Sequence, residues 1–118
     1  MRKQFQDEMY FDTVTIAAGQ STSIRLDLGE YTLCGVQIPA GMTGTALTFL
    51  GSVDDETYVP LKILSGTKLT MVIDATASVT AASPQDTACC RFIKVVSNAA
   101  EAAARDILLI SVRAVENV

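Results

Sequence analysis

The residues of this sequence that could carry out chemistry begin with one short run of carboxylates. Asp54, Asp55 and Glu56 follow one another and form its one acidic cluster. Neighbouring carboxylates can bind a hard cation such as calcium, or can act as the acid and the base of a hydrolase. The D-x-D-x-D-G spacing of a calcium loop is missing here. We therefore interpret the cluster as a solvated turn and predict no metal site.

The second set of reactive groups is three cysteines, Cys34, Cys89 and Cys90. Three thiols cannot all pair within one chain, and no repeated C-x-x-C spacing is present. The sequence contains no histidine, which excludes a Ser-His-Asp triad, a Cys-His pair and the commonest transition-metal ligand. We predict reduced, structural cysteines in an intracellular folding compartment, with Cys34 as a small core residue.

Catalysis finds no other support in the sequence. Neither G-x-x-x-x-G-K-[ST] nor G-x-G-x-x-G is present, so nothing indicates nucleotide chemistry. A carboxylate-dependent hydrolase would rest on residues 54–56 alone. We predict that the protein is not an enzyme and binds no cofactor.

Charge and hydropathy limit the partners of the chain. The formal net charge is -4, with nine Lys and Arg against thirteen Asp and Glu, so a nucleic-acid phosphate backbone would be repelled. The longest apolar runs, such as residues 107–110, are far shorter than the roughly 20 residues of a spanning helix. We predict no nucleic-acid partner and no membrane partner. Because 49% of the 118 residues are hydrophobic, one core can form.

The elements that must position these groups show a period of two, which is typical of half-buried strands. The predicted strands cover residues 13–16, 24–28, 33–38, 46–52, 58–63, 69–73, 91–97 and 107–114. This pattern predicts an all-β fold, a sandwich of about eight antiparallel strands, either jelly-roll or immunoglobulin-like. The first two strands either form a hairpin or cross between sheets.

Some finer features of the sandwich also follow from the sequence. We expect Pro39 to end the third strand, since proline has no N–H for the ladder. Phe49 and Phe92 are expected in the core. In the last strand we expect Leu108, Ile110 and Val112 to face inward, because the opposite register would bury Ser111 and Arg113 without partners. Residues 75–88 and 98–105 are expected to be connections, and the alanine run in the second could form a helical turn or two.

Large apolar residues gather at the N-terminus, ahead of the first clear strand. We divide the chain into an N-terminal arm, residues 1–11, and a single β-sandwich domain, residues 12–118. Apolar side chains of the arm need a surface to cover. They either fold back over their own sandwich or dock on a neighbouring subunit. The candidate interface residues are Phe5, Tyr10 and Phe11.

The order of short motifs along the chain resembles that of the small β-sandwich virion proteins of tailed bacteriophages. The motifs are Thr13-Val14-Thr15-Ile16, Gly19-Gln20-Ser21-Thr22-Ser23, Leu28-Gly29, Val36-Gln37-Ile38-Pro39-Ala40, Leu47-Thr48-Phe49, Ser52 with Asp54-Asp55, Tyr58-Val59-Pro60-Leu61 and Arg105-Asp106-Ile107-Leu108-Leu109. The resemblance implies a head decoration (cement) protein, or else a head-tail or tail component.

Such a decoration protein would bind the major capsid protein or other virion subunits across the seams of the shell. The resemblance implies a homo-oligomer, with a trimer favoured. The protein would be made in the bacterial host cytoplasm and located in the virion. Its acidity favours the outer capsid surface, away from the packaged DNA.

The alternative function is a tail- or fibre-associated module that binds a carbohydrate or a receptor. Sugar sites depend on flat aromatic surfaces, and this chain has three Tyr, four Phe and no Trp. The loops around Tyr31, Asp54 and Tyr58 are the candidates for such a site. Binding of the isolated domain on a glycan array would favour this alternative.

Overall fold

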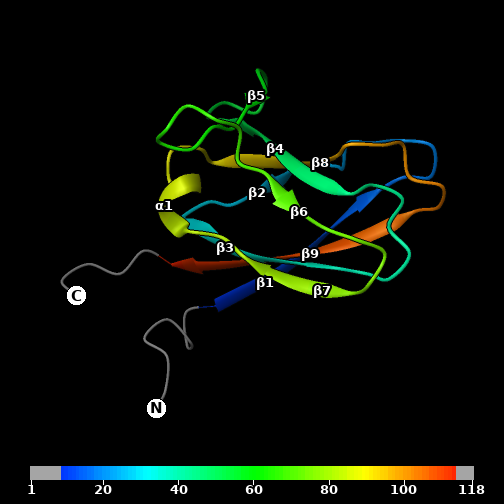
Figure 1. Cartoon of the computed structure of the whole chain (residues 1–118). Coiled ribbons are helices and arrows are strands. Elements are labelled where there is room, and N and C mark those ends of the chain that lie inside the picture. The colour runs from blue at the N-terminus through cyan, green and yellow to red at the C-terminus, as the bar shows by residue number, and fades with distance from the viewer. Residues whose placement is uncertain (1–8, 114–118) are drawn as a thin grey trace, which may run out of the picture.

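Two antiparallel sheets lie face to face in the computed structural model, which describes residues 9–113 (Figure 1). The elements are β1 (Met9–Ile16), β2 (Leu26–Asp27), β3 (Tyr31–Ile38), β4 (Ala46–Ser52), β5 (Val59–Pro60), β6 (Met71–Val72), β7 (Ser78–Ala81), α1 (Pro84–Thr87), β8 (Phe92–Ser97) and β9 (Arg105–Arg113). The predicted all-β sandwich is confirmed.

Strand order identifies the topology of the sandwich. One sheet has the order β1-β9-β3-β7, and the other has the order β2-β8-β4-β5 with β6 also paired to β4. Because β5 and β6 pair with opposite ends of β4, they occupy one strand position, which leaves four positions in each sheet. The first and last strands are neighbours, and β1 and β2 lie in different sheets. This is the order of a jelly roll, whereas an immunoglobulin fold pairs its first two strands in one sheet.

Strand β4 shows how the sequence pattern produces the core. Its Leu47 and Phe49 are two residues apart, so they share the inner face, and both are at most 1% exposed. In β3 the inward residues Leu33 and Val36 are three apart, because a β-bulge at Cys34 shifts the register. Strand β3 ends at Ile38, directly before Pro39, as predicted.

The predicted register of the last strand is wrong. Ile107 and Leu109 of β9 are fully buried, whereas Leu108 and Ile110 are only half-buried on the outer face of their sheet. Val112, the third residue expected inside, is 3% exposed, although it shares the outer side with Leu108 and Ile110. Ser111 is buried without an unsatisfied hydroxyl, because this hydroxyl donates a hydrogen bond of 3.5 Å to the carbonyl oxygen of Tyr10. Arg113 is exposed and lies 3.5 Å from a Glu30 carboxylate oxygen.

Several other expectations are corrected. Strand β7 lies within residues 75–88, which were expected to be a connection. Residues 98–104 are a connection, as predicted, and form no helix. The predicted strands at residues 24–28 and 58–63 shrink to two residues each. Phe92 is half-buried rather than in the core, because it stands on the outer side of β8 beneath the guanidinium groups of Arg25 and Arg91, which lie 5.4 and 5.2 Å from its ring centroid.

The boundary of the predicted arm also moves. Strand β1 begins at Met9, which pairs with Val112, so residues 9–11 belong to the sheet. The reason is that β9 extends to Arg113 and thus offers ladder partners beyond Thr13. Residues 1–8, with Phe5, and residues 114–118 lie outside the described part of the chain.

Candidate interaction surface

The outer side of the β1-β9-β3-β7 sheet carries two rows of directly paired, uncharged residues. One row is Phe11, Ile110, Gly35 and Ala81, and the next is Thr13, Leu108, Gln37 and Val79. We call these eight residues the apolar face. Directly opposed residues of antiparallel strands point to the same side, so the rows form a continuous surface over all four strands.

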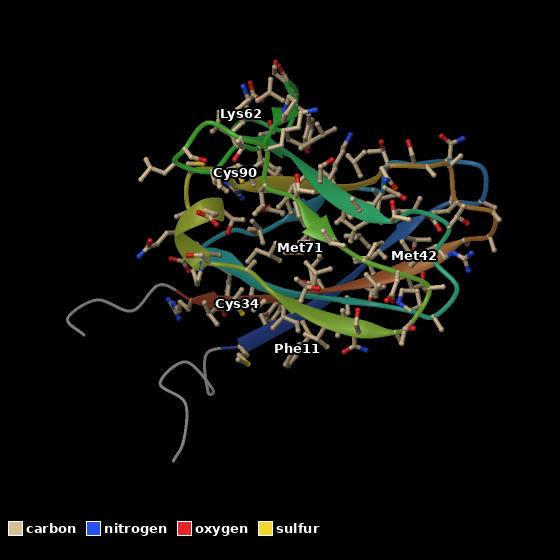
Figure 2. All side chains as sticks on the ribbon, in the orientation of Figure 1. Phe11, Cys34, Met42, Lys62, Met71 and Cys90 are labelled. Carbon is tan, nitrogen blue, oxygen red and sulfur yellow. The ribbon has the colours of Figure 1, made fainter. Side chains whose placement is uncertain are left out.

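The apolar face is exposed to solvent at both of its edge strands, β1 and β7. Phe11 is 58% exposed and Val79 is 60% exposed, while Leu108 and Ile110 between them are half-buried. Figure 2 shows Phe11 on the side of β1 that points away from the second sheet, whereas Met71 points into the space between the sheets. In a sandwich, outward positions are usually polar. Exposed apolar patches are candidates for interaction surfaces, and the apolar face is one such candidate.

Tyr10 and Phe11, which we predicted as one interface, lie on opposite faces of β1. Phe11 belongs to the apolar face. Tyr10 points to the other side, where its ring centroid lies 5.1 Å from that of Tyr31. Both tyrosines line a pocket of about 350 Å³, which Asp12, Asp27 and Glu30 also line. The two residues were not separated in the sequence analysis because residues 1–11 were assigned there to an arm, whereas neighbours in a strand point to opposite faces.

In the acidic turn, the Asp54 carboxylate accepts hydrogen bonds from within the turn itself. The Asp54 Oδ1 atom accepts hydrogen bonds from the Glu56 and Thr57 N–H groups and from the Ser52 hydroxyl, at 2.9–3.0 Å. These bonds lower the pKa of Asp54, with the Glu56 N–H as the largest cause. Within residues 9–113, no group of three or more side chains is suited to holding a metal ion.

The hydroxyl and the ring of Tyr58 both make contacts within the protein. Its hydroxyl donates a hydrogen bond to Asp55, whose other oxygen lies 2.9 Å from Arg25 Nε. Burial, followed by this hydrogen bond, raises the pKa of Tyr58 to about 12. Lys94 Nζ lies 4.2 Å from the centre of the ring. Tyr58 is therefore unlike Tyr31, whose ring lines an open pocket.

The three cysteines are free thiols in different environments. Cys34 sits at the β3 bulge and is half-buried rather than fully in the core, and burial raises its pKa. Cys90 packs against the core, and burial, with a smaller effect of Cys89, raises its pKa to about 11. Cys89 is exposed in the turn after α1.

This difference predicts the order of thiol modification. With iodoacetamide at pH 8, Cys89 should be labelled at least tenfold faster than Cys90, since a thiol of pKa about 11 is only about one-thousandth thiolate at that pH. Cys34 should also react slowly because it is half-buried. Peptide fragmentation by mass spectrometry distinguishes the adjacent sites. Equal labelling of Cys89 and Cys90 would contradict the packing of Cys90.

A buried acid that the sequence analysis missed holds one end of the sandwich together. The carboxylate of Glu101, 1% exposed, accepts hydrogen bonds of 2.8–3.0 Å. The donors are Thr43 N–H, Gly44 N–H, the Ser97 hydroxyl and Arg105 Nε, and we call these five residues the Glu101 network. Because each bond favours the charged carboxylate, the network is a structural element. The only available signal was one acid inside an alanine run.

The fold and its exposed features define this protein as a jelly-roll sandwich with two uncharged rows of residues on the outer side of one sheet. Comparisons with known protein families and with curated proteins find no match. The fold is similar to that of the SPBc2 prophage-derived protein YomS, known from a crystal structure, with a TM-score of 0.52 and 12% sequence identity. The similarity covers 88% of this chain and 94% of YomS. At this identity it shows a shared fold.

No helix within residues 9–113 has the length and apolar character that a transmembrane helix requires.

Proposed function

We propose that this chain is a structural protein of a phage virion, and more specifically a capsid decoration protein. The apolar face is the observation that carries the proposal. Four strands present two rows without a charge, and the buried core of a protein interface is apolar and poor in charged residues. The shared fold with a prophage-derived protein supports the phage assignment.

The mode of action would be mechanical. The apolar face would lie against the outer surface of the shell, where its partner is the major capsid protein or another virion subunit. Burial of this face would stabilise the shell by contact area and requires no turnover. The net charge of -4 supports an exterior position, since an inner lining would face the packaged phosphates.

A pair of matched substitutions tests the docking surface. Val79→Asp places a charge on the apolar face, and we expect at least a tenfold loss of affinity for expanded capsids, because the carboxylate would be desolvated without a partner. Val72→Asp is the control, since Val72 is 84% exposed on the other sheet. Co-sedimentation of the purified variants with capsids measures the effect. Equal occupancy by both variants would rule out the apolar face.

A second candidate function is supported by the pocket beside Tyr10. A tilted pair of tyrosines, at an interplanar angle of 34°, beside the exposed carboxylate of Glu30 offers aromatic surface and a hydrogen-bond acceptor for a carbohydrate. This site would suit a tail- or fibre-associated receptor-binding module. Glycan-array binding that disappears in Tyr31→Ala would favour it, whereas an empty array would leave the decoration role as the better proposal.

A further inference from the structure

Strand β1 has an open edge. In the described part of the chain it pairs with β9 on one side and has no strand on the other. The Thr15 carbonyl accepts a hydrogen bond of 3.3 Å from the Ile24 N–H, so the polar groups of Thr15 point toward this open side. Alternate residues of an antiparallel strand point their N–H and C=O the same way. Met9, Phe11 and Thr13 therefore present theirs to the open edge as well.

We propose that this edge pairs with the same edge of a second copy of the chain. The two β1 strands would run antiparallel about a two-fold axis normal to the sheet and centred on Phe11. This register uses all three open residues: Phe11 faces the partner's Phe11, and Met9 faces the partner's Thr13. Long open edges are ready templates for strand pairing, and a two-fold contact needs one self-complementary patch.

The charge of Asp12 and the occupied edge at Thr15 favour this register over those centred on Asp12 and Thr13. Asp12 is the single charged residue of the strand. Centring on Phe11 places Asp12 opposite the partner's Tyr10, whose hydroxyl can donate to a carboxylate. Centring on Asp12 would set two carboxylates directly opposite each other, which destabilises a sheet. Centring on Thr13 would bring Phe11 against the partner's Thr15, whose edge is already used by Ile24.

The pairing would join the two sheets into one that crosses the dimer. Because the axis is normal to the sheet, both apolar faces would lie on the same side. The dimer would present a surface twice as large to whatever the apolar face contacts. The dimer does not rest on the proposed function, since the isolated chain should form it without a capsid. It replaces the trimer that the resemblance favoured.

Cysteine cross-linking of the full chain tests the register. In a background with Cys89→Ser, Tyr10→Cys and Asp12→Cys are prepared as separate proteins. Facing residues of this kind lie about 4.5 Å apart between Cα atoms, within disulfide range. We expect a covalent dimer after mild oxidation of the mixture and little in either variant alone. Cross-linking in either single sample to the level of the mixture would overturn the register.

Edge blocking tests the dimer itself. Thr13→Pro removes an N–H that points to the open edge and spares the β1–β9 ladder, so the chain should fold and become monomeric. Thr13→Val keeps the N–H and should remain dimeric. Light scattering gives the mass of each variant, and circular dichroism checks its fold. A monomeric or trimeric wild-type chain would overturn the proposal, and if Thr13→Pro does not fold, the cross-linking result decides.

Discussion

Replacement of Glu101 by alanine should lower the free energy of unfolding by about 3–5 kcal/mol, the range for breaking a buried ion pair. The substitution removes the acceptor for two backbone N–H groups, one hydroxyl and the Arg105 guanidinium. A whole domain is stable by only about 5–15 kcal/mol, so this is a large fraction. Urea unfolding at pH 7 measures it. A change below about 1 kcal/mol would contradict the structural role of the network.

The same residue predicts how stability depends on pH. Burial alone would raise the pKa of Glu101, but the hydrogen bonds of the network outweigh it and lower the pKa from 4.5 to about 2. A group whose pKa is lowered by folding stabilises the protein above its unfolded pKa. The contribution is therefore complete above about pH 4.5 and is lost as the pH falls toward 2.

A matched variant isolates this effect. Glu101→Gln keeps the size of the side chain and has no carboxyl to titrate. It should be less stable than the wild type at pH 7, and the difference between the two proteins should narrow between pH 4.5 and pH 2. Urea midpoints at several pH values give the comparison. A constant difference over this range would show that another group dominates the acid response.

Replacement of Gly44 by alanine should destabilise the protein by about 3 kcal/mol or more, through overpacking and disturbed hydrogen bonds to a charged group. A Cβ atom at this position would overlap the Ser97 hydroxyl and lie 2.9 Å from Asn98 Oδ1. The Ser97 hydroxyl and the Gly44 N–H both donate to the Glu101 carboxylate. The substitution would displace these donors and weaken both hydrogen bonds.

Gly35→Ala is the control for this prediction. A Cβ at Gly35 would meet Ile110 Cδ1 at 3.4 Å and the Thr80 carbonyl oxygen at 3.5 Å, which is ordinary contact. We expect its unfolding free energy to stay within about 1 kcal/mol of the wild type. Thermal or urea unfolding of the two variants side by side measures the contrast. Equal losses would mean that glycine matters for strand conformation and not for the space around Glu101.

Much of the fold was predictable from local pattern. The alternation of residues 46–52 predicted β4 and the burial of Phe49, and Pro39 correctly marked the end of β3. These features depend on neighbours in sequence, since alternation and the missing proline N–H act within one strand. The candidate site was predicted only in part. Phe11 is exposed on the apolar face, but Tyr10 lies on the other side of its strand.

The alternation of apolar residues along the chain was enough to predict an all-β sandwich, and in β4 and β9 it also predicted which side chains share a face. The tertiary structure decided which of those faces is inward. In β9 it turned Leu109 into the core and Leu108 out to the apolar face, because register depends on pairing with β1 and β3. It likewise decided the jelly-roll strand order and the role of Glu101. The register of β9, the strand order and the role of Glu101 each depend on residues far away in the sequence. A local pattern of residues carries no information about such contacts.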